Sequence, residues 1–418
     1  MQVAPAPSIV ESGEVLVYLA VLRTMAARIF GLRFSLFYAF FMIGTGIQLP
    51  FFPLWLHAKG LTVAEIALVI AGMTASRIVA VPLAAIIADT YRNRRTMIVL
   101  CGIASLFGYF LLAWANGFWF ILGASLLVSL CFAPVFPLSE SFSVDGSAVH
   151  GLDYGRLRLW ASISFLVGNL GAGALLLYLP VTSLIYLIFL AQGISALMAF
   201  LLPPDPERDN PVHDSGQPAS LARAFKLLVA GSFVVFIAAV SLGQASHAML
   251  YAFGPVHWDR LGYDKFTIGG LWAISIMAEV TLFSFSNSIV RKFGPVALIT
   301  TGISGGVLRW LVMAQDFGLA VTVVMQGLHA ISFAMVHLGT THYIHQTVPR
   351  GLRNSAQGLY AAFSGGIVMS SAMWLSGLLY GELLGKTYLV MAVISLVALS
   401  LALALKRISP TTLVTVDT

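Results

Sequence analysis

Apolar runs long enough to cross a bilayer recur along nearly the whole chain, and no other feature constrains its fold as strongly. A transmembrane helix needs about 20 consecutive, mostly apolar residues. Of the 418 residues, 59% are hydrophobic and only 10% are charged, whereas a soluble domain carries about 25% charged residues. The sequence therefore predicts an all-α membrane protein, because lipid is the only solvent that accommodates so much apolar sequence.

The apolar runs predict twelve transmembrane helices in two sets of six. The first set should form an N-terminal bundle over 32–202, with helices at 32–56, 63–88, 96–114, 118–139, 157–179 and 181–202. The second set should form a C-terminal bundle over 224–406, with helices at 224–252, 265–289, 295–314, 317–341, 354–380 and 386–406.

The remaining segments are polar or lie at the chain ends. Residues 203–223 are expected to be a cytoplasmic linker, because Pro203 to Ser220 is too rich in proline and charge to pack or to span. Residues 1–31 and 407–418 are expected to be cytoplasmic tails. In the first tail, the stretch from Glu14 to Arg28 is compatible with an interfacial helix. Its pattern is not that of a secretory signal peptide, and Met25 is an alternative start.

Lys and Arg are distributed unevenly between the two sides of these helices. The tails, the linker and every second loop carry 17 of the 23 basic residues, and the alternate loops carry 4. The positive-inside rule therefore predicts an inner-membrane protein with both termini and the linker in the cytoplasm.

An internal repeat relates the two halves of the chain. A shift of 202 residues superposes the first two predicted helices on the seventh and eighth without a gap. The matching pairs are Phe51 with Phe253, Pro53 with Pro255, Gly60 with Gly262 and Ile66 with Ile268. We therefore expect two pseudo-symmetric bundles that flank a substrate cavity.

Three ionisable residues lie inside the predicted helices, where each costs about 2.5 to 3.5 kcal/mol even on the lenient insertion scale. They are Arg77, Glu279 and Arg309, and the 202-residue shift superposes Arg77 on Glu279. We interpret Glu279 as a proton-coupling carboxylate with Arg309 as its partner, the alternative being a static ion pair. We interpret Arg77 as the ligand of a substrate anion, the alternative being a structural contact to a backbone carbonyl.

Two predicted helices carry polar stripes. In the seventh, the stripe consists of Ser241, Gln244, His247 and Tyr251, spaced three, three and four apart on one helical face. In the tenth, it consists of Gln326, His329 and His337. Corresponding stripes in the two helices favour a water-filled cavity wall where histidines bind substrate or relay protons. The alternative is polar contact between helices.

Prolines, glycines and aromatic residues yield weaker predictions. Pro134 and Pro137 interrupt the fourth helix just before Glu140, which could then take part in proton coupling. Glycines should allow close helix contact, namely Gly168, Gly171, Gly173, Gly365 and Gly366. Most aromatic residues of the first and eleventh helices are expected to face lipid, namely Phe37, Tyr38, Phe40, Phe41, Phe51, Phe52, Trp55 and Trp374.

Other chemistries lack support in the sequence. The net charge of +6 comes from basic residues scattered singly through short loops, which does not indicate a nucleic-acid partner. Cys101 and Cys131 lie inside apolar runs, so neither a disulfide nor a metal site is expected. No phosphate-binding loop, nucleophile elbow or zinc-protease motif occurs. We expect no cofactor and no enzymatic activity.

The chain resembles the major facilitator superfamily in its two halves and in the loop from Ala88 to Arg95, ADTYRNRR. It is more similar to the phenylpropionate permease family of proton symporters through LDYGRLRLWAS, GQASHAMLYAFGPVHW, SIMAEVTLFSFSN, VLRW and QGLHAISFAMVHL. The loop lacks the expected glycines, and Ala161 stands where glycine is expected. The resemblance implies conformational or gating roles for Asp89, Arg92 and Arg158.

The residues and the resemblance together predict an importer that couples protons to a small aromatic monocarboxylate such as 3-phenylpropionate. Its partners would be that substrate, protons and the lipid bilayer, and the superfamily suggests a monomer. Three alternatives remain open at this stage, namely a nucleoside or sugar symporter, an exporter of drugs or metabolites, and a non-transporting scaffold or receptor.

Overall fold

The computed structural model describes residues 9–205, Leu227, 231–349 and 352–408. Over these ranges every regular element is a helix and no strand occurs. Ten of the helices are long and apolar enough to cross a membrane. An all-helical multi-pass membrane protein is therefore confirmed.

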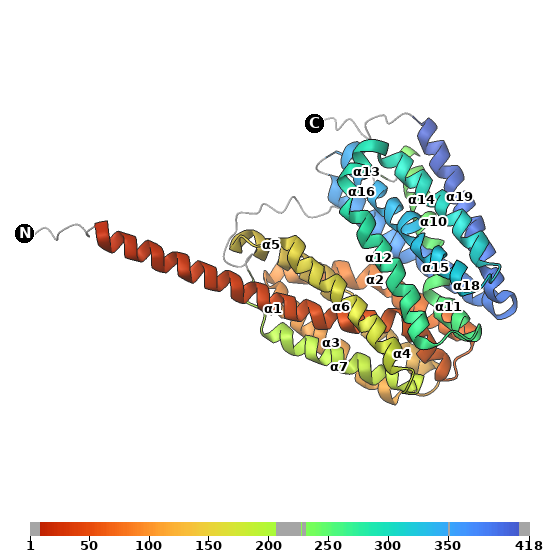
Figure 1. Cartoon of the computed structure of the whole chain (residues 1–418), viewed down its shortest axis with the longest axis horizontal. Coiled ribbons are helices and arrows are strands. Elements are labelled where there is room, and N and C mark those ends of the chain that lie inside the picture. The colour runs from red at the N-terminus through yellow and green to blue at the C-terminus, as the bar shows by residue number, and fades with distance from the viewer. Residues whose placement is uncertain (1–8, 206–226, 228–230, 350–351, 409–418) are drawn as a thin grey trace, which may run out of the picture.

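The elements before the predicted linker are coloured red to yellow-green in Figure 1. They are α1 (Ile9–Ala58), α2 (Val63–Tyr91), α3 (Arg94–Trp114), α4 (Phe118–Phe132), α5 (Val135–His150), α6 (Tyr154–Leu175), η1 (Val181–Ser183) and α7 (Leu184–Phe200). In this part of the chain α1 packs against both α6 and α7, and α3 packs against α4 and α7.

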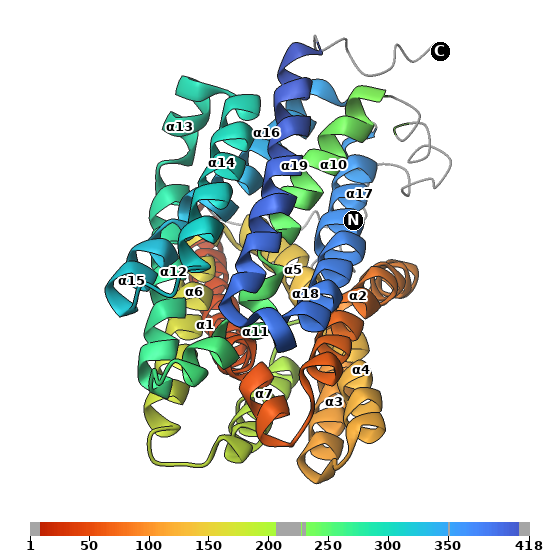
Figure 2. The same ribbon diagram turned by 90° about the vertical axis from the view of Figure 1, so that its right-hand side faces the viewer.

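The elements after the linker lie on the other side of the molecule in Figure 1 and run from green to blue. They are α10 (Gly231–Ala245), α11 (Ala248–Arg260), α12 (Lys265–Ser284), α13 (Ser286–Phe293), α14 (Pro295–Met313), α15 (Leu319–Gly327), η2 (Ala330–Met335), α16 (Val336–Thr347), α17 (Arg353–Ala362), η4 (Phe363–Val368), α18 (Met369–Leu383), η5 (Leu384–Lys386) and α19 (Thr387–Arg407). Figure 2 shows α19 lying beside α14 and α10, against which it packs.

Several predicted helices are interrupted. The fourth is divided into α4 and α5 at Pro134, because proline removes a backbone donor from the helix. The tenth and eleventh each contain a π-helical segment, η2 and η4. Such segments occur often at functional sites.

The internal repeat extends to local geometry. Gly60 and Gly262, 202 residues apart, both adopt positive φ, at 84° and 88°. These turns end α1 and α11, and the next helices begin with side-chain caps from Thr62 and Asp264, which are again 202 residues apart. The same chain positions therefore make the same helix–turn–helix in both halves, where only glycine adopts this turn without strain.

The beginning of the chain differs from its predicted form. The predicted tail over residues 1–31 contains the start of α1, which begins at Ile9 and continues into the first predicted span without a break. Figure 1 shows its N-terminal part projecting from the body of the molecule. The stretch from Glu14 to Arg28 is therefore helical as part of α1, and its place at the membrane interface stays a prediction.

Most of the named aromatic residues of α1 are buried, with Phe40 half-buried, so the prediction that most of them face lipid was wrong. Their rings stack on one another and on α5, as Phe34 does on Phe142 with ring centroids 5.7 Å apart. The buried set comprises Phe37, Tyr38, Phe41, Phe51, Phe52 and Trp55. Trp374 of α18 is 50% exposed, as expected for a lipid-facing ring. The rings of α1 pack inside the protein, as Phe41 does on Phe132 of α4 with ring centroids 4.9 Å apart, which composition alone does not reveal.

The start of the predicted linker is anchored. Asp205 is 2% exposed and accepts hydrogen bonds from the backbone N–H and guanidinium of Arg94 at 2.7 Å. Arg94 also pairs with Asp145 of α5 at 2.6 Å. The prediction that this stretch does not pack is thus wrong for Asp205, and the linker from residue 206 to 223 lies outside the described residues.

Helices from the two halves of the chain meet near the first turns of α2 and α12. There α2 packs on α18, where a Cβ on Gly377 would collide with Ala67. Similarly, α6 packs on α12, and Asn169 donates a hydrogen bond to the carbonyl of Gly269 at 3.0 Å. Because Ala67 and Gly269 are 202 residues apart, the two contacts are related by the repeat.

The predicted packing glycines divide into two groups. A Cβ on Gly168, Gly173 or Gly366 would meet a neighbouring helix at under 3.0 Å, so these residues do allow close contact. A Cβ on Gly171 or Gly365 would meet nothing within 4 Å, and the packing role was wrong for these two.

Candidate functional site

A cavity of about 510 Å³ lies between the two halves of the chain. Its lining comes from α1, α2 and α4 on one side and from α11, α12, η2, η4 and α18 on the other. This volume lies in the range of small-molecule sites, roughly 300–1,000 Å³. Apolar and aromatic side chains dominate the wall, among them Phe52, Phe132, Phe333, Met73, Met369 and Met373.

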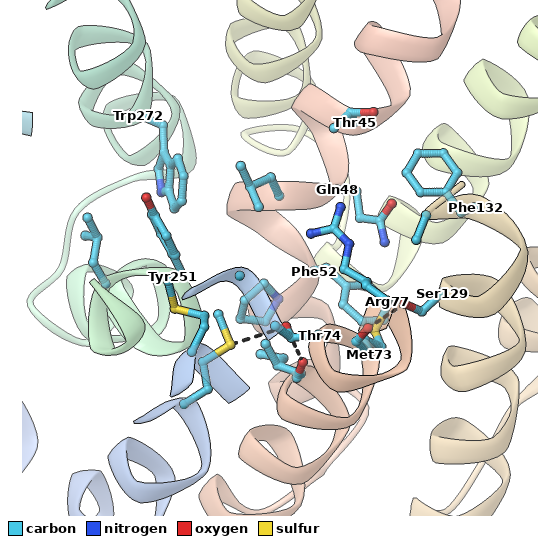
Figure 3. A pocket seen from close by; sticks show the side chains of 18 of the residues that line it. Thr45, Gln48, Phe52, Met73, Thr74, Arg77, Ser129, Phe132, Tyr251 and Trp272 are labelled. Atoms are coloured by element: carbon cyan, nitrogen blue, oxygen red, sulfur yellow. Dashed lines mark hydrogen bonds between the residues drawn. The ribbon is translucent and has the colours of Figure 1, made fainter. Parts of the chain in front are cut away.

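Arg77 lines the cavity from α2 and is an exposed residue. It forms neither a hydrogen bond nor an ion pair with any residue in the described part of the chain. Figure 3 shows its guanidinium directed toward Gln48 of α1. An unpaired guanidinium at a cavity wall can bind a carboxylate through two hydrogen bonds.

Gln48 presents its amide nitrogen beside Arg77. The hydroxyl of Tyr109, which is buried on α3, donates a 2.5 Å hydrogen bond to Gln48 Oε1. This bond occupies the amide oxygen, so the amide nitrogen is left to donate into the cavity near Arg77 (Figure 3). Two donors therefore converge on one region of the N-terminal wall.

Glu279 lines the opposite side of the cavity, from α12. Its carboxylate lies 3.7 Å from Nε2 of His329, and the side chain of Glu279 is 21% exposed. Among the described residues no ion pair joins Glu279 to Arg309, which was its expected partner. His329 lies between them instead.

Arg309 is fully buried and sets the orientation of His329. Its guanidinium donates to His329 Nδ1 at 3.0 Å. Arg309 has no acceptor, so Nδ1 must accept, and in a neutral ring the proton is then on Nε2, which faces Glu279. Arg309, His329 and Glu279 therefore form a row of side chains in which one imidazole lies between a buried cation and the cavity carboxylate.

The remaining contacts of Arg309 are all neutral. Its other hydrogen bonds run to Gln326 Oε1 at 2.9 Å and to Ser332 Oγ at 3.0 Å, and its guanidinium lies 4.7 Å from the Trp310 ring centre. Its Nε has no hydrogen-bond partner. A buried cation with only neutral partners is costly, which makes a nearby negative charge at Glu279 favourable.

The rest of the predicted stripes lies behind the cavity wall. His247 is fully buried and contacts Ser332 Oγ at 3.1 Å. Gln244 donates to the carbonyl of Phe333 at 3.3 Å, and His337 contacts Tyr360 at 3.4 Å. Of the predicted substrate-binding residues, only Arg77, Tyr251 and His329 line the cavity, whereas Gln244, His247, Gln326 and His337 support its wall.

Glu140 forms a separate cluster on α5. Its carboxylate accepts hydrogen bonds from Tyr38 at 2.5 Å and from Tyr154, and it pairs with Arg158 at 3.4 Å. The Arg158 guanidinium also lies 5.3 Å from the Phe136 ring centre. Glu140 is therefore satisfied by three partners and does not line the cavity.

Asp89, in the last turn of α2, and Arg92, just after that helix, are both exposed. Arg92 adopts positive φ, at 47°, and caps α2 through its backbone N–H. The buried charged residue nearby is Arg94, the first residue of α3, which sequence reasoning did not single out. Its signal was available, because a second basic residue follows the capping turn and starts α3.

Sequence reasoning also missed Gln48, Trp272 and Ser332. Each is an uncharged residue in a run of apolar neighbours. The free-energy cost of placing a side chain in the membrane is large only for charged residues, so it points only to them. Gln48 and Trp272 line the cavity, and Ser332 bonds Arg309 behind its wall. These positions come from tertiary packing.

Comparison with known proteins identifies what the chain is similar to. A family model described as the MFS_1 like family matches residues 32–390. The "Probable 3-phenylpropionic acid transporter" of Escherichia coli strain K12 is 29% identical over 368 residues, which cover 88% of this chain and 96% of that protein. The "Maltose permease" of Geobacillus stearothermophilus is 25% identical over 395 residues, covering 90% and 94%.

Solved structures agree with this chain in fold. The nucleoside transporter NupG superposes with a TM-score of 0.78 at 16% identity and covers 90% of this chain and 98% of its own. A bacterial homologue of the lysosomal transporter Spinster, in an inward-facing and unoccupied conformation, has a TM-score of 0.68 at 15% identity and covers 91% and 97%. At these identities the likeness concerns the fold alone.

Proposed function

The chain belongs to the MFS_1 like family and is a secondary transporter of the major facilitator type, and on this premise we propose that it imports an aromatic monocarboxylate, such as 3-phenylpropionate, together with protons. The observation that carries the proposal is the cavity between the two halves of the chain. It has an unpaired cation, Arg77, on one wall, and on the other it has the carboxylate of Glu279 beside the hydrogen-bonded pair of His329 and Arg309.

The substrate would bind with its carboxylate at Arg77 and Gln48 and its ring among the apolar side chains. The guanidinium of Arg77 has no other partner in the described chain, and Gln48 is oriented by Tyr109. Phe52 and Phe132 lie on the same side of the cavity as Arg77 (Figure 3). A substrate with a carboxylate at one end and an apolar ring at the other would therefore match a guanidinium that lies beside apolar side chains.

Proton coupling would use Glu279, His329 and Arg309. Loading a proton on Glu279 removes a charge from the cavity wall, and the N–H at Nε2 of His329, 3.7 Å away, faces the charged carboxylate and favours it. Arg309 holds the His329 ring in place and favours the charged carboxylate through electrostatic attraction. The residues behind the cavity wall, His247, Gln326 and Ser332, would hold these three side chains in place.

Twelve membrane crossings in two six-helix bundles are part of the proposal. Ser355–Arg407 is counted as one span of 53 residues although it contains two predicted helices, and α6 is not among the ten spans. Splitting the first and adding the second gives twelve. Both termini, the linker over 203–223 and the ends of the bundles 32–202 and 224–406 would then be cytoplasmic, in an inner membrane, with a monomer as the working unit.

Alternating access would involve the two close contacts between the halves. Under the proposed orientation, the Ala67–Gly377 and Asn169–Gly269 contacts lie at the periplasmic end, so this conformation would be closed there. The opposite end holds the Glu140–Arg158 pair and the Asp89 and Arg92 turn, which we propose as gating elements.

Nucleoside or sugar transport is a second candidate, favoured by the relatives. NupG is a nucleoside transporter and the Geobacillus protein is a maltose permease. In that case cavity hydroxyl and amide groups would bind substrate hydroxyls and Arg77 would not be needed for charge recognition.

Uptake into proteoliposomes separates the candidates. Labelled 3-phenylpropionate should accumulate under an imposed inward proton gradient and collapse to equilibrium when the gradient is dissipated. Unlabelled aromatic acids should compete, whereas uridine and maltose should not. Accumulation that only uridine or maltose suppresses, or no uptake of any aromatic acid, would contradict the proposed substrate.

A further inference from the structure

Two hydrogen-bonding groups on the cavity wall formed by α11 and α12 remain unused by a plain phenyl ring. Trp272 Nε1 is buried and has no hydrogen-bond partner. The Tyr251 hydroxyl makes no hydrogen bond with any residue of the described chain, and both side chains line the cavity. A buried donor without a partner costs about 1–3 kcal/mol. A ligand that supplies an acceptor here would recover part of that energy.

The two groups form one local site. The rings of Tyr251 and Trp272 are 5.8 Å apart between centroids with an interplanar angle of 30°. Figure 3 shows the Tyr251 hydroxyl pointing toward the Trp272 ring, across the cavity from Arg77 and Gln48. The neighbouring hydroxyl of Ser275 is already bonded to Gln326 at 2.6 Å and is not available.

The charge of Glu279 restricts what the site can accept. Glu279 follows Trp272 by seven residues, so both lie on the same face of α12, and Glu279 lines the same cavity as Tyr251. A second carboxylate on the ligand would be repelled there. A hydroxyl fits, because it accepts from Tyr251 or Trp272 and can donate its own proton.

We propose that the cavity is built for a hydroxyaryl carboxylate, with the carboxylate at Arg77 and Gln48 and a ring hydroxyl at Tyr251 and Trp272. The inference rests on the proposed function, since it names the aromatic acids that the transporter prefers. Met73, Met369 and Met373 line the space between the two polar ends and provide an adaptable apolar surface for the ring. A site that hydrogen-bonds a hydroxyl rejects the analogue that lacks it far more strongly than an apolar pocket discriminates by size.

Binding of matched ligands to the purified full chain tests this proposal. Calorimetric titration would compare 3-(4-hydroxyphenyl)propionate with 3-phenylpropionate, which differ only in the ring hydroxyl. We expect the hydroxylated acid to bind at least about tenfold more tightly, as one recovered hydrogen bond of about 1.4 kcal/mol requires. 4-Ethylphenol, which has the hydroxyl and no carboxylate, should bind more weakly than both acids.

Variants identify the groups responsible for the ratio of the two affinities. Tyr251→Phe and Trp272→Phe each remove the polar atom and keep an aromatic ring, and each should lower the preference for the hydroxylated acid severalfold. Tyr178→Phe removes a hydroxyl that is far from the cavity on an 87% exposed side chain, and should leave the ratio unchanged. Two independent variants keep the test informative if one of them fails to fold.

Each outcome has a definite meaning. Equal affinity for the two acids, or a ratio that survives both variants, would overturn the hydroxyaryl preference and leave the proposed aromatic-acid function standing. Failure of both acids to bind would overturn the proposed function and this inference together.

Discussion

Arg309 donates a hydrogen bond to Nδ1 of His329 across 3.0 Å, so the opposite nitrogen of that imidazole carries the proton that faces the cavity. Both residues are buried, with exposures of 0% and 4%. This relationship makes His329 the link between Arg309 and Glu279.

Arg309→Lys should impair both stability and transport. Lysine keeps the charge but lacks the planar fork that bonds Gln326, His329 and Ser332 at once. Each acceptor left without its donor costs about 1–3 kcal/mol. We expect a lower melting temperature in detergent and at least a tenfold fall in uptake rate. Arg156→Lys changes an arginine side chain that is 88% exposed and serves as the control, and equal behaviour of the two variants would contradict the role of Arg309.

Arg77→Gln should weaken carboxylate binding without unfolding the protein. Arg77 has no partner in the described chain, so its loss leaves no acceptor unsatisfied. A charge-assisted hydrogen bond contributes about 1.5–3 kcal/mol, which corresponds to roughly 10- to 150-fold in affinity. Titration with 3-phenylpropionate measures this change. Arg291→Gln, at the exposed end of α13, is the matched control. An unchanged affinity in Arg77→Gln would show that the anion binds elsewhere.

Gly168→Leu should destabilise the protein, whereas Gly171→Leu on the same helix should not. A Cβ at Gly168 would lie 2.8 Å from Cα of Ile43 in α1, and a Cβ at Gly171 would meet nothing within 4 Å. Overpacking of this kind costs about 1–3 kcal/mol. Thermal unfolding of the two variants in the same detergent provides the comparison. Similar melting temperatures would mean that α1 and α6 separate easily at this point.

Much of the fold follows from the sequence because charged residues are costly in lipid, whereas long apolar runs are favourable there. The runs of apolar residues located the helices, and the shift of 202 residues located two equivalent turns at Gly60 and Gly262. The count of twelve membrane-spanning helices remains a prediction. α6 is less apolar than the ten candidate spans, and the last two predicted helices fall within one candidate span, Ser355–Arg407. Only the packing of α1 shows that its aromatic residues are buried.

The candidate site was predicted only where a residue is charged. Insertion cost singled out Arg77, Glu279 and Arg309, two of which line the cavity. The sequence could not show that His329 separates Glu279 from Arg309, since that depends on how α14 and η2 pack. Gln48 carries no insertion signal, and only its bond with Tyr109 reveals its orientation.

The coupling role of Glu279 is the central claim, and transport by Glu279→Gln in proteoliposomes tests it most directly. Glutamine keeps the size of the side chain and cannot take up a proton. The claim predicts that this variant loses gradient-driven accumulation of 3-phenylpropionate but retains exchange of labelled for unlabelled substrate across the membrane. Glu382→Gln, on an exposed residue at the end of α18, should accumulate substrate like the unmodified protein. Accumulation by Glu279→Gln that equals that of the unmodified protein would contradict the claim.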